Sequence, residues 1–377
     1  MDVTAATDLR SALVLGGGGL KGFAHLGVLR ALQEHGIRPS VFAGTSIGGM
    51  LAAAYVGGMP LDEMFERARA FRRRDLFRLN HARLLLDRMG AHSLYLDGPL
   101  RTICESVCPS GTFESLASPL LINTVDLERG TQVVWGLPGL RDVPVADAVY
   151  ASCALPGFFP PGQVDGRKCA DGGTVDNLPV PIAALGTQAV IAVDVGSRDL
   201  ALRSDIHEQG FATIYMRAAT MMMKRLQEFH LDGWSGPPML LIRPRISHVG
   251  WFDFGRVEEV VAEGYRAATE ALACWAEVRL APGGIYPRRR VHVMVDREAC
   301  TGCGLCVSLA PQVMALDAQR KAYALASTVD WSPADGSFVG QCPTNAILCD
   351  GPERTLPIAD SSEEPALSPA PLVGKAS

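Results

Sequence analysis

The sequence lacks an apolar run long enough to cross a bilayer, which takes about 20 consecutive apolar residues. It also lacks an excess of positive charge, because 35 Lys and Arg against 40 Asp and Glu leave a formal net charge of −5. That balance argues against a nucleic-acid partner. The first residues, MDVTAATDLRSALVL, lack the long apolar segment of a secretory signal. We therefore expect a cytoplasmic protein without a transmembrane segment.

Cysteine occurs ten times, and it is unevenly distributed. Cys300, Cys303 and Cys306 stand three residues apart in CTGCGLC, and Cys342 follows later, directly before a proline. Thiolates at this spacing hold the corners of a cubane iron–sulfur cluster. Such a motif, without a secretory signal, favours metal binding in a reducing compartment over disulfides. We expect the remaining six to be core residues or buried thiols: Cys104, Cys108, Cys153, Cys169, Cys274 and Cys349.

The stretch DREACTGCGLCVSLAPQVM resembles the motif of bacterial ferredoxins, whose two-cluster forms carry C-x2-C-x2-C-x3-C-P twice. Ala310 stands where the first copy would have its fourth cysteine. Zinc is the alternative, but it usually takes its cysteines as two C-x2-C pairs, which fits this spacing poorly. The second copy has lost its three other ligands, at Phe338, Asp335 and Ser332. The resemblance implies a small α+β ferredoxin-like domain with one [4Fe–4S] cluster, bound by Cys300, Cys303, Cys306 and Cys342.

Short apolar runs alternate with helical segments in the larger, N-terminal part of the chain. This alternation predicts an α/β fold in which helices cover both faces of a mostly parallel sheet. Helices are expected at Gly22–His35 and Ser46–Val56. The candidate buried strands are Ser11–Leu15, Val41–Ala43, Leu120–Val125, Val190–Val195 and Met239–Arg243.

The sequence GTSIG at 44–48 matches G-x-S-x-G, a pattern that places a serine on a sharp turn between a strand and a helix. Glycines flank the serine because larger side chains would collide with the strand and the helix. The turn exposes the Ser46 hydroxyl beside a helix N-terminus, where the helix dipole favours negative charge. We therefore predict that Ser46 is a nucleophile.

Four glycines at 16–19 lie between the first expected strand and the first expected helix. Glycine amides can turn toward an oxyanion without steric cost, and a serine nucleophile requires such donors. We therefore predict an oxyanion hole formed by Gly17, Gly18 and Gly19. The alternative is a dinucleotide site, because Gly17, Gly19 and Gly22 fit G-x-G-x-x-G. That site needs an acidic residue at the end of the second strand, and VFAG has none.

A serine nucleophile also needs a base. His25 is the nearest histidine in the sequence, but its place on the first expected helix favours a packing role. Asp171 is followed directly by two glycines, which allow a close approach to another group. A carboxylate can act as the base when burial raises its pKa. We therefore predict that Asp171 is the base for Ser46.

Four motifs together resemble the patatin-like phospholipase family, most closely its bacterial and neuropathy-target-esterase-like branch: GGGGLKG (16–22), GTSIGG (44–49), ASCALPGFFPP (151–161) and DGGTVDNLP (171–179). The similarity covers roughly residues 11–275. It implies a three-layer α/β fold, a Ser46–Asp171 dyad and an oxyanion hole at Gly17–Gly19. It also implies a phospholipid or another lipid ester as substrate, and it leaves both hydrolysis and acyl transfer open.

The motifs divide the chain into parts. We expect a hydrolase domain at 1–286, a basic linker at 287–290, a single-cluster domain at 291–355 and a disordered tail at 356–377. The predicted function is hydrolysis of lipid esters, with the cluster serving redox sensing or the docking of a redox partner protein. The alternative is an electron-transfer protein whose first domain anchors it on lipid or on a partner.

Two further segments have competing interpretations. Residues 61–88 have helical spacing, with eight arginines against five acids. We expect a solvated amphipathic helix there, and the alternative is a surface for anionic lipid headgroups that gives peripheral membrane contact. Met221–Met223 are expected in a core helix, and the alternative is an acyl-binding site.

Overall fold

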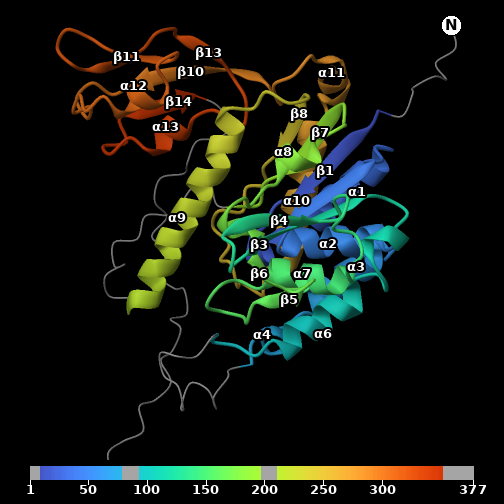
Figure 1. Ribbon diagram of the computed structural model, residues 1–377. Helices are drawn as coiled ribbons and strands as arrows, with labels where there is room; N and C mark the ends of the chain where they lie inside the picture. The colour runs from blue at the N-terminus through green and yellow to red at the C-terminus, as the bar shows by residue number, and fades with distance from the viewer. Residues whose placement is uncertain (1–8, 79–92, 197–209, 351–377) are drawn as a thin grey trace, which may run out of the picture.

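The computed structural model describes residues 9–78, 93–196 and 210–350. A large sheet with its helices forms the N-terminal part, and a smaller body carries the C-terminal strands (Figure 1). No helix in these ranges is both long enough and apolar enough to span a membrane. The tail expected at 356–377 lies outside the described residues.

The large sheet has nine strands, eight of them in the order β5-β6-β3-β2-β1-β7-β8-β9, while β4 pairs with β3. Neighbours in the series β3, β2, β1, β7, β8 and β9 pair in parallel. Strands β4 and β6 pair antiparallel with β3, and β5 pairs antiparallel with β6. The mostly parallel sheet is therefore confirmed. Its strands are β1 (Ser11–Leu15), β2 (Val41–Thr45), β3 (Leu120–Asp126), β4 (Thr131–Trp135), β5 (Gly162–Val164), β6 (Arg167–Asp171), β7 (Ala189–Val193), β8 (Met239–Ile242) and β9 (Ile285–Tyr286).

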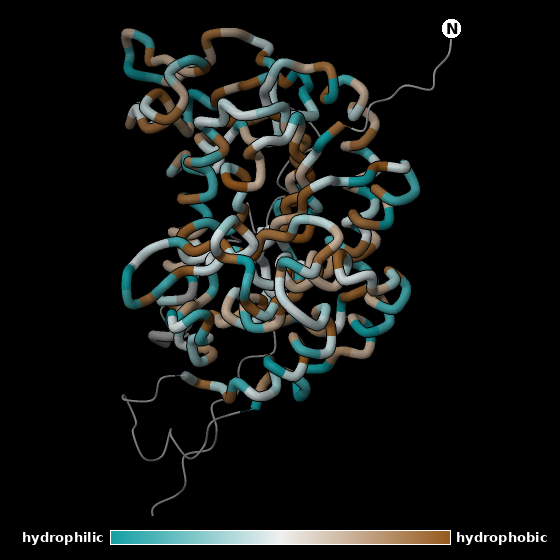
Figure 2. Tube along the Cα trace, turned by 45° about the vertical axis from the view of Figure 1, so that its right-hand side comes forward, coloured by the Kyte–Doolittle hydropathy of each residue, from teal (hydrophilic) through white to brown (hydrophobic). Residues whose placement is uncertain are grey.

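Alternate side chains of the central strands face opposite layers. Leu13 and Leu15 join one core with the larger set of helices, whereas Ala12 and Val14 join a second core. Apolar segments gather along these strands in Figure 2. The first core packs α1 (Ala24–Glu34), α2 (Ile47–Val56), α3 (Leu61–Ala70), α6 (Gly98–Val107), α7 (Val145–Cys153), α10 (Val257–Leu272) and α11 (Trp275–Leu280). The second packs α8 (Val180–Ala183) and the C-terminal end of α9 (Gly210–Asp232).

The prediction of one helix over residues 61–88 is wrong. Helix α3 ends at Ala70, and a short helix, α4 (Arg73–Leu76), follows after a break. At the break Phe71 is extended, with φ −67° and ψ 129°. Its ring packs against Phe23 and Phe254 at centroid distances of 6.4 and 5.5 Å. Packing of the Phe71 ring therefore ends the helix that the spacing of apolar residues predicts. Residues 79–88 of the predicted helix lie outside the described ranges.

The smaller body has a three-stranded sheet in the order β13-β10-β14 and a hairpin of β11 and β12. Its own apolar core includes Val291, Trp331 and Phe338. Strand β10 begins at Arg289, so two of the residues expected in the linker belong to a strand. The elements are β10 (Arg289–Val295), α12 (Leu305–Leu309), β11 (Met314–Leu316), β12 (Ala322–Ala324), β13 (Thr328–Trp331), α13 (Ser337–Gly340) and β14 (Ile347–Asp350).

The two bodies touch at the loop after β13. Arg243, directly after β8, donates from its guanidinium to the Pro333 carbonyl oxygen and pairs with Asp194 at 2.9 Å. Ala334 is 9% exposed and belongs to the same apolar core as Leu231 and Leu241. The loop after β13 therefore docks the smaller body on the second face of the large sheet.

This contact predicts the effect of Ala334→Asp. The substitution buries a carboxylate among apolar side chains, so we expect it to lower the free energy of unfolding by about 1–3 kcal/mol. Thermal unfolding followed by calorimetry measures the change. Ala326→Asp, at an exposed position in the same domain, is the matched control. Equal unfolding temperatures for the two variants would mean that Ala334 is not packed as described.

Candidate functional site

Ser46 sits on a strained turn between β2 and α2. Its φ of 54° and ψ of −129° lie in a region that residues other than glycine rarely adopt. The flanking glycines are required by contact: a Cβ on Gly44 would lie 2.5 Å from the Gly49 nitrogen, and one on Gly48 would lie 2.1 Å from the Leu15 oxygen. The turn has the backbone geometry expected of a nucleophile elbow.

Asp171 reaches Ser46 because two strands end at neighbouring positions on β3. In the parallel ladder Thr45 pairs with Asn123, and in the antiparallel ladder Asp171 pairs with Thr124. The Ser46 hydroxyl lies close enough to the Asp171 carboxylate to lower the pKa of that carboxyl group. The structure therefore brings together the two residues that sequence motifs 125 positions apart had singled out.

The Asp171 carboxyl group is only 4% exposed. Burial raises its pKa to about 6, against the opposing effects of the Gly173 amide and the Ser46 hydroxyl. The Gly173 N–H donates to Oδ1 at 2.8 Å, and this bond fixes the orientation of the carboxylate. Asp171 is thus ionised at neutral pH and more basic than an exposed aspartate, whose pKa is about 4.

Two buried residues that sequence reasoning missed hold this arrangement in place. The Ser46 N–H donates to Ser152 Oγ at 2.8 Å, and Ser152 in turn donates to the Asn123 carbonyl oxygen at 2.7 Å. Asn123 Nδ2 donates to the Asp176 carbonyl oxygen at 2.6 Å, on the loop after Asp171. The available signal was an asparagine and a serine inside otherwise apolar segments, LLINTVD and VYASCAL.

The glycine loop is only partly available for an oxyanion. The Gly16 and Gly17 N–H groups already donate to the carbonyl oxygens of Val193 and Asn177, at 3.0 and 3.1 Å. Within the described part of the chain, Gly18 and Gly19 show no comparable backbone acceptor. The Gly17 amide thus helps to hold the loop in this structure, and the oxyanion hole at Gly17, Gly18 and Gly19 stays a prediction.

His25 holds the glycine loop through a hydrogen bond to its backbone. Its Nε2 lies 2.8 Å from the Gly16 carbonyl oxygen, and its side chain is fully buried. Burial lowers its pKa to about 4, against the opposing effects of Gly16 and Asp194. A neutral imidazole that donates from Nε2 fits these contacts. The packing role expected for His25 is confirmed.

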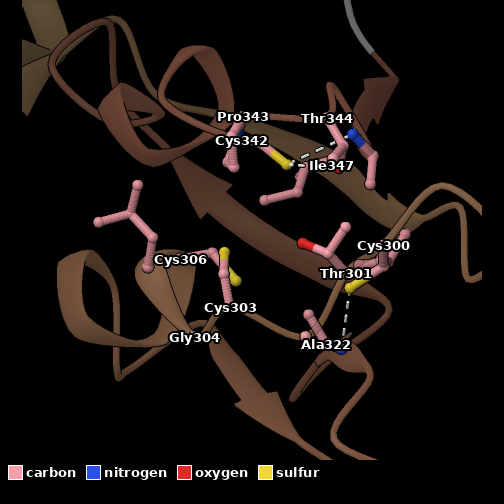
Figure 3. Close-up of a pocket in the computed structure, with 14 residues that line it drawn as sticks. Cys300, Thr301, Cys303, Gly304, Cys306, Ala322, Cys342, Pro343, Thr344 and Ile347 are labelled. Atoms are coloured by element: carbon pink, nitrogen blue, oxygen red, sulfur yellow. Dashed lines mark hydrogen bonds between the residues drawn. The ribbon is translucent and has the colours of Figure 1, made fainter.

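The four cysteines of the ferredoxin motif line one cavity (Figure 3). Cys300, Cys303 and Cys306 come from the segment before and within α12, and Cys342 comes from the loop after α13. In the described residues, no three His, Cys, Asp or Glu side chains converge on a single metal position. A cubane instead binds each thiolate at a different iron, and thiols spread around a shared cavity suit it better than a tetrahedral zinc site.

Backbone donors at this cavity also suit bound thiolates. The Ala322 N–H points at Cys300 Sγ at 3.5 Å, and the Ala346 N–H points at Cys342 Sγ at 3.4 Å. Burial raises the pKa of Cys342, but hydrogen bonds from Thr344 and Ala346 outweigh it and bring the pKa below its usual value. N–H groups aimed at sulfur stabilise the anionic form and tune cluster potentials. The four cysteines therefore fit an iron–sulfur cluster.

Two positions where the motif predicts lost ligands of a second cluster hold core side chains. Ala310 and Phe338 are 3% and 4% exposed and belong to the core of the small domain. Trp331 packs on Phe338 with ring centroids 6.0 Å apart. Cys349, on β14, pairs across the sheet with Val293 on β10, and it does not line the cavity.

Two family models match the chain. The patatin-like phospholipase model matches residues 13–184, and the 4Fe-4S single cluster domain model matches residues 293–348. The two matches fall on the large sheet and on the small body respectively.

Curated relatives agree with the first match. An uncharacterised NTE family protein of Mycobacterium tuberculosis is 34% identical over 198 residues, covering 52% of each chain. Lysophospholipase NTE1 of Mycosarcoma maydis is 30% identical over 302 residues, covering 72% of this chain and 15% of that protein. Patatin-like phospholipase domain-containing protein 6 of Homo sapiens is 27% identical over 316 residues, covering 76% and 22%. This chain thus spans no more than about half the length of these relatives.

Among solved structures, VipD from Legionella pneumophila is similar with a TM-score of 0.37 and 15% identity, covering 71% of this chain and 67% of that one.

The family matches, the dyad geometry and the cysteine cavity agree with one another. The chain carries a domain of the patatin-like phospholipase family followed by a 4Fe-4S single cluster domain.

Proposed function

We propose that this protein hydrolyses lipid esters of the phospholipase or lysophospholipase type. The observation that carries the proposal is the placement of the Ser46 hydroxyl, on its strained turn, beside the buried Asp171 carboxylate. A relative named lysophospholipase supports the same substrate class.

The residues suggest a sequence of proton transfers. Asp171 accepts the Ser46 proton while the serine oxygen attacks the ester carbonyl carbon, which gives a tetrahedral oxyanion. The Gly18 and Gly19 N–H groups, at the start of a short helical turn, are the candidate donors to that oxyanion. The protonated Asp171 then supplies a proton to the leaving alcohol, and a water molecule activated by the same carboxylate releases the acid.

We propose a regulatory or docking role for the cluster domain rather than a chemical one. Ester hydrolysis moves no electrons, so an iron–sulfur cluster has no step to perform in it. The contact of Arg243 with both Asp194 and the Pro333 carbonyl oxygen supports communication between the domains. A redox change at the cluster, or a redox partner protein bound there, would act through this contact.

Removing the nucleophile or the base tests the dyad. We expect Ser46→Ala and Asp171→Asn each to lower kcat for a soluble short-chain ester by about 10^4-fold or more, because the serine then lacks its oxygen or its base. Steady-state kinetics on purified protein measures the loss.

The matched control is Asp165→Asn, at an exposed turn between β5 and β6, which should retain full turnover. If Ser46→Ala keeps most of the activity, the dyad assignment is wrong. If His25→Ala abolishes turnover in a folded protein while Asp171→Asn does not, the base is a histidine.

The pKa of Asp171 predicts the pH dependence. The base must be ionised, so kcat/KM for a soluble ester should fall as pH drops through about 6, the value to which burial raises this pKa. The rate should be level between neutral pH and mild alkali. A circular dichroism melt at each pH separates titration from unfolding. An acid limb centred near pH 4 would indicate that the base is not buried in solution.

The cysteine cavity predicts the metal content. Protein purified without oxygen should be brown and contain about four iron and four sulfide per chain, as one cubane requires. Cys303→Ala should lower iron content and bleach the visible absorption, whereas Cys349→Ala, outside the cavity, should change neither. A colourless protein with one zinc per chain would contradict the cluster.

A further inference from the structure

Helix α9 directs its apolar side toward solvent. Six large apolar side chains on it are 44–75% exposed: Ile214, Tyr215, Met221, Met222, Leu226 and Phe229. At 100° per residue all six fall on one side of the helix, while Gln227 and Leu231 on the other side are buried. The interpretation of Met221 and Met222 as core residues is therefore wrong. An apolar stripe of this size on a soluble domain marks a surface that binds something.

The opposite side of α9 contacts the residues around the dyad. Gln227 Oε1 accepts from Asn177 Nδ2 at 3.2 Å, and His230 Nδ1 lies 3.7 Å from Asp176 Oδ1. Met223 is close enough that its Cε would lie 3.0 Å from a Cβ placed on Gly173. Because a helix is about 10 Å wide, whatever binds the apolar stripe lies roughly one helix diameter from the catalytic loop.

The charges on α9 indicate what binds there. Helix α9 contains Arg217, Lys224 and Arg225 against Glu228 and Asp232, a formal surplus of one positive charge, although the whole chain has a net charge of −5. Glu228 offsets part of this charge through its contacts with Lys224 and Arg225, at 3.7 and 3.2 Å. At 100° per residue Arg225 lies within the apolar stripe and Arg217 lies beside one edge of it. A stripe that combines apolar and basic residues is typical of helices that lie in the surface of an anionic lipid layer. A second copy of the chain would instead bring the same cations together across a symmetric interface.

We propose that α9 is the helix through which this protein docks on an anionic lipid surface. Its apolar stripe enters the layer below the headgroups, and Arg217 and Arg225 contact the phosphates. Docking in this orientation holds the catalytic loop beside the layer, so that a lipid ester reaches Ser46 without crossing bulk water. This proposal rests on the proposed function for its purpose, but the binding itself does not depend on hydrolysis.

The test uses the full chain with Met222 and Phe229 replaced by glutamine, which preserves helix propensity and adds no charge. Binding is measured by co-sedimentation with mixed phosphatidylcholine and phosphatidylglycerol vesicles, in a Ser46→Ala background so that no lipid is consumed. We expect partitioning to fall at least about tenfold, because two apolar side chains no longer enter the layer. The matched control is Leu185→Gln with Leu280→Gln, which removes two residues that are 67% and 88% exposed elsewhere and should bind normally.

The same substitutions with Ser46 intact separate docking from chemistry. Met222→Gln with Phe229→Gln should keep the turnover of a soluble short-chain ester and lose most of the turnover of vesicle lipid. Vesicles of phosphatidylcholine alone should bind the unsubstituted protein more weakly. Equal vesicle binding by the two double variants, or no binding by the unsubstituted chain, overturns the docking proposal. So does a dimer, seen by analytical ultracentrifugation, that only the α9 substitutions dissociate.

The two proposals can fail separately. If the protein binds vesicles through α9 but hydrolyses neither the soluble ester nor the lipid, the proposed function is wrong and the docking surface stands. If it hydrolyses the soluble ester while the α9 substitutions leave vesicle binding unchanged, the enzyme assignment stands and the docking surface is wrong.

Discussion

The proposed catalytic pair, Ser46 and Asp171, depends on how β2 and β6 share one edge of β3. Strand β4 occupies the other edge along Ile122–Asp126, so both β2 and β6 must use the remaining one. Strand β2 ends there with Thr45 opposite Asn123, and β6 ends with Asp171 opposite Thr124. The C-terminal ends of β2 and β6 therefore point toward each other, and the residue after β2 is Ser46. A shift of one residue in either ladder would turn a catalytic side chain to the opposite face.

Sequence motifs predicted Ser46, Asp171 and the cysteines because the residues next to each of them in the sequence are the ones that its chemistry requires. The glycines beside Ser46 relieve contacts that lie within the same turn. The roles of Asn123 and Ser152, in contrast, arise from hydrogen bonds to residues 53 and 106 positions away. No local pattern encodes such pairings. Five strands of the parallel part were predicted to within two residues at each end. Strands β4, β5, β6 and β9 were missed because they are short or half exposed.

Position in a motif did not separate the glycines of the loop by role. Gly17 resembles Gly18 and Gly19 in sequence, but its amide donates to Asn177, whose side chain in turn donates to the Gly17 carbonyl oxygen at 3.0 Å. Only the folded loop after Asp171 makes this distinction. Helix α9 gives a second example, since its methionines have the composition of a core helix. Their exposure follows from the polar partners of its other side, Gln227 and His230.

The lost second cluster and the domain contact are parts of one feature. Ser332 and Asp335 stand where the ferredoxin motif predicts lost cluster ligands, and the residues between them, Pro333 and Ala334, dock on the larger, N-terminal body. Arg243 also binds Asp194. Val195, which follows Asp194 in the sequence, packs against Gly18: a Cβ placed on Gly18 would lie 2.9 Å from Val195 Cγ2. Direct contacts thus run from the cluster domain to a candidate oxyanion donor. Because Asp194 is 6% exposed, loss of its partner would leave a buried charge uncompensated beside the glycine loop.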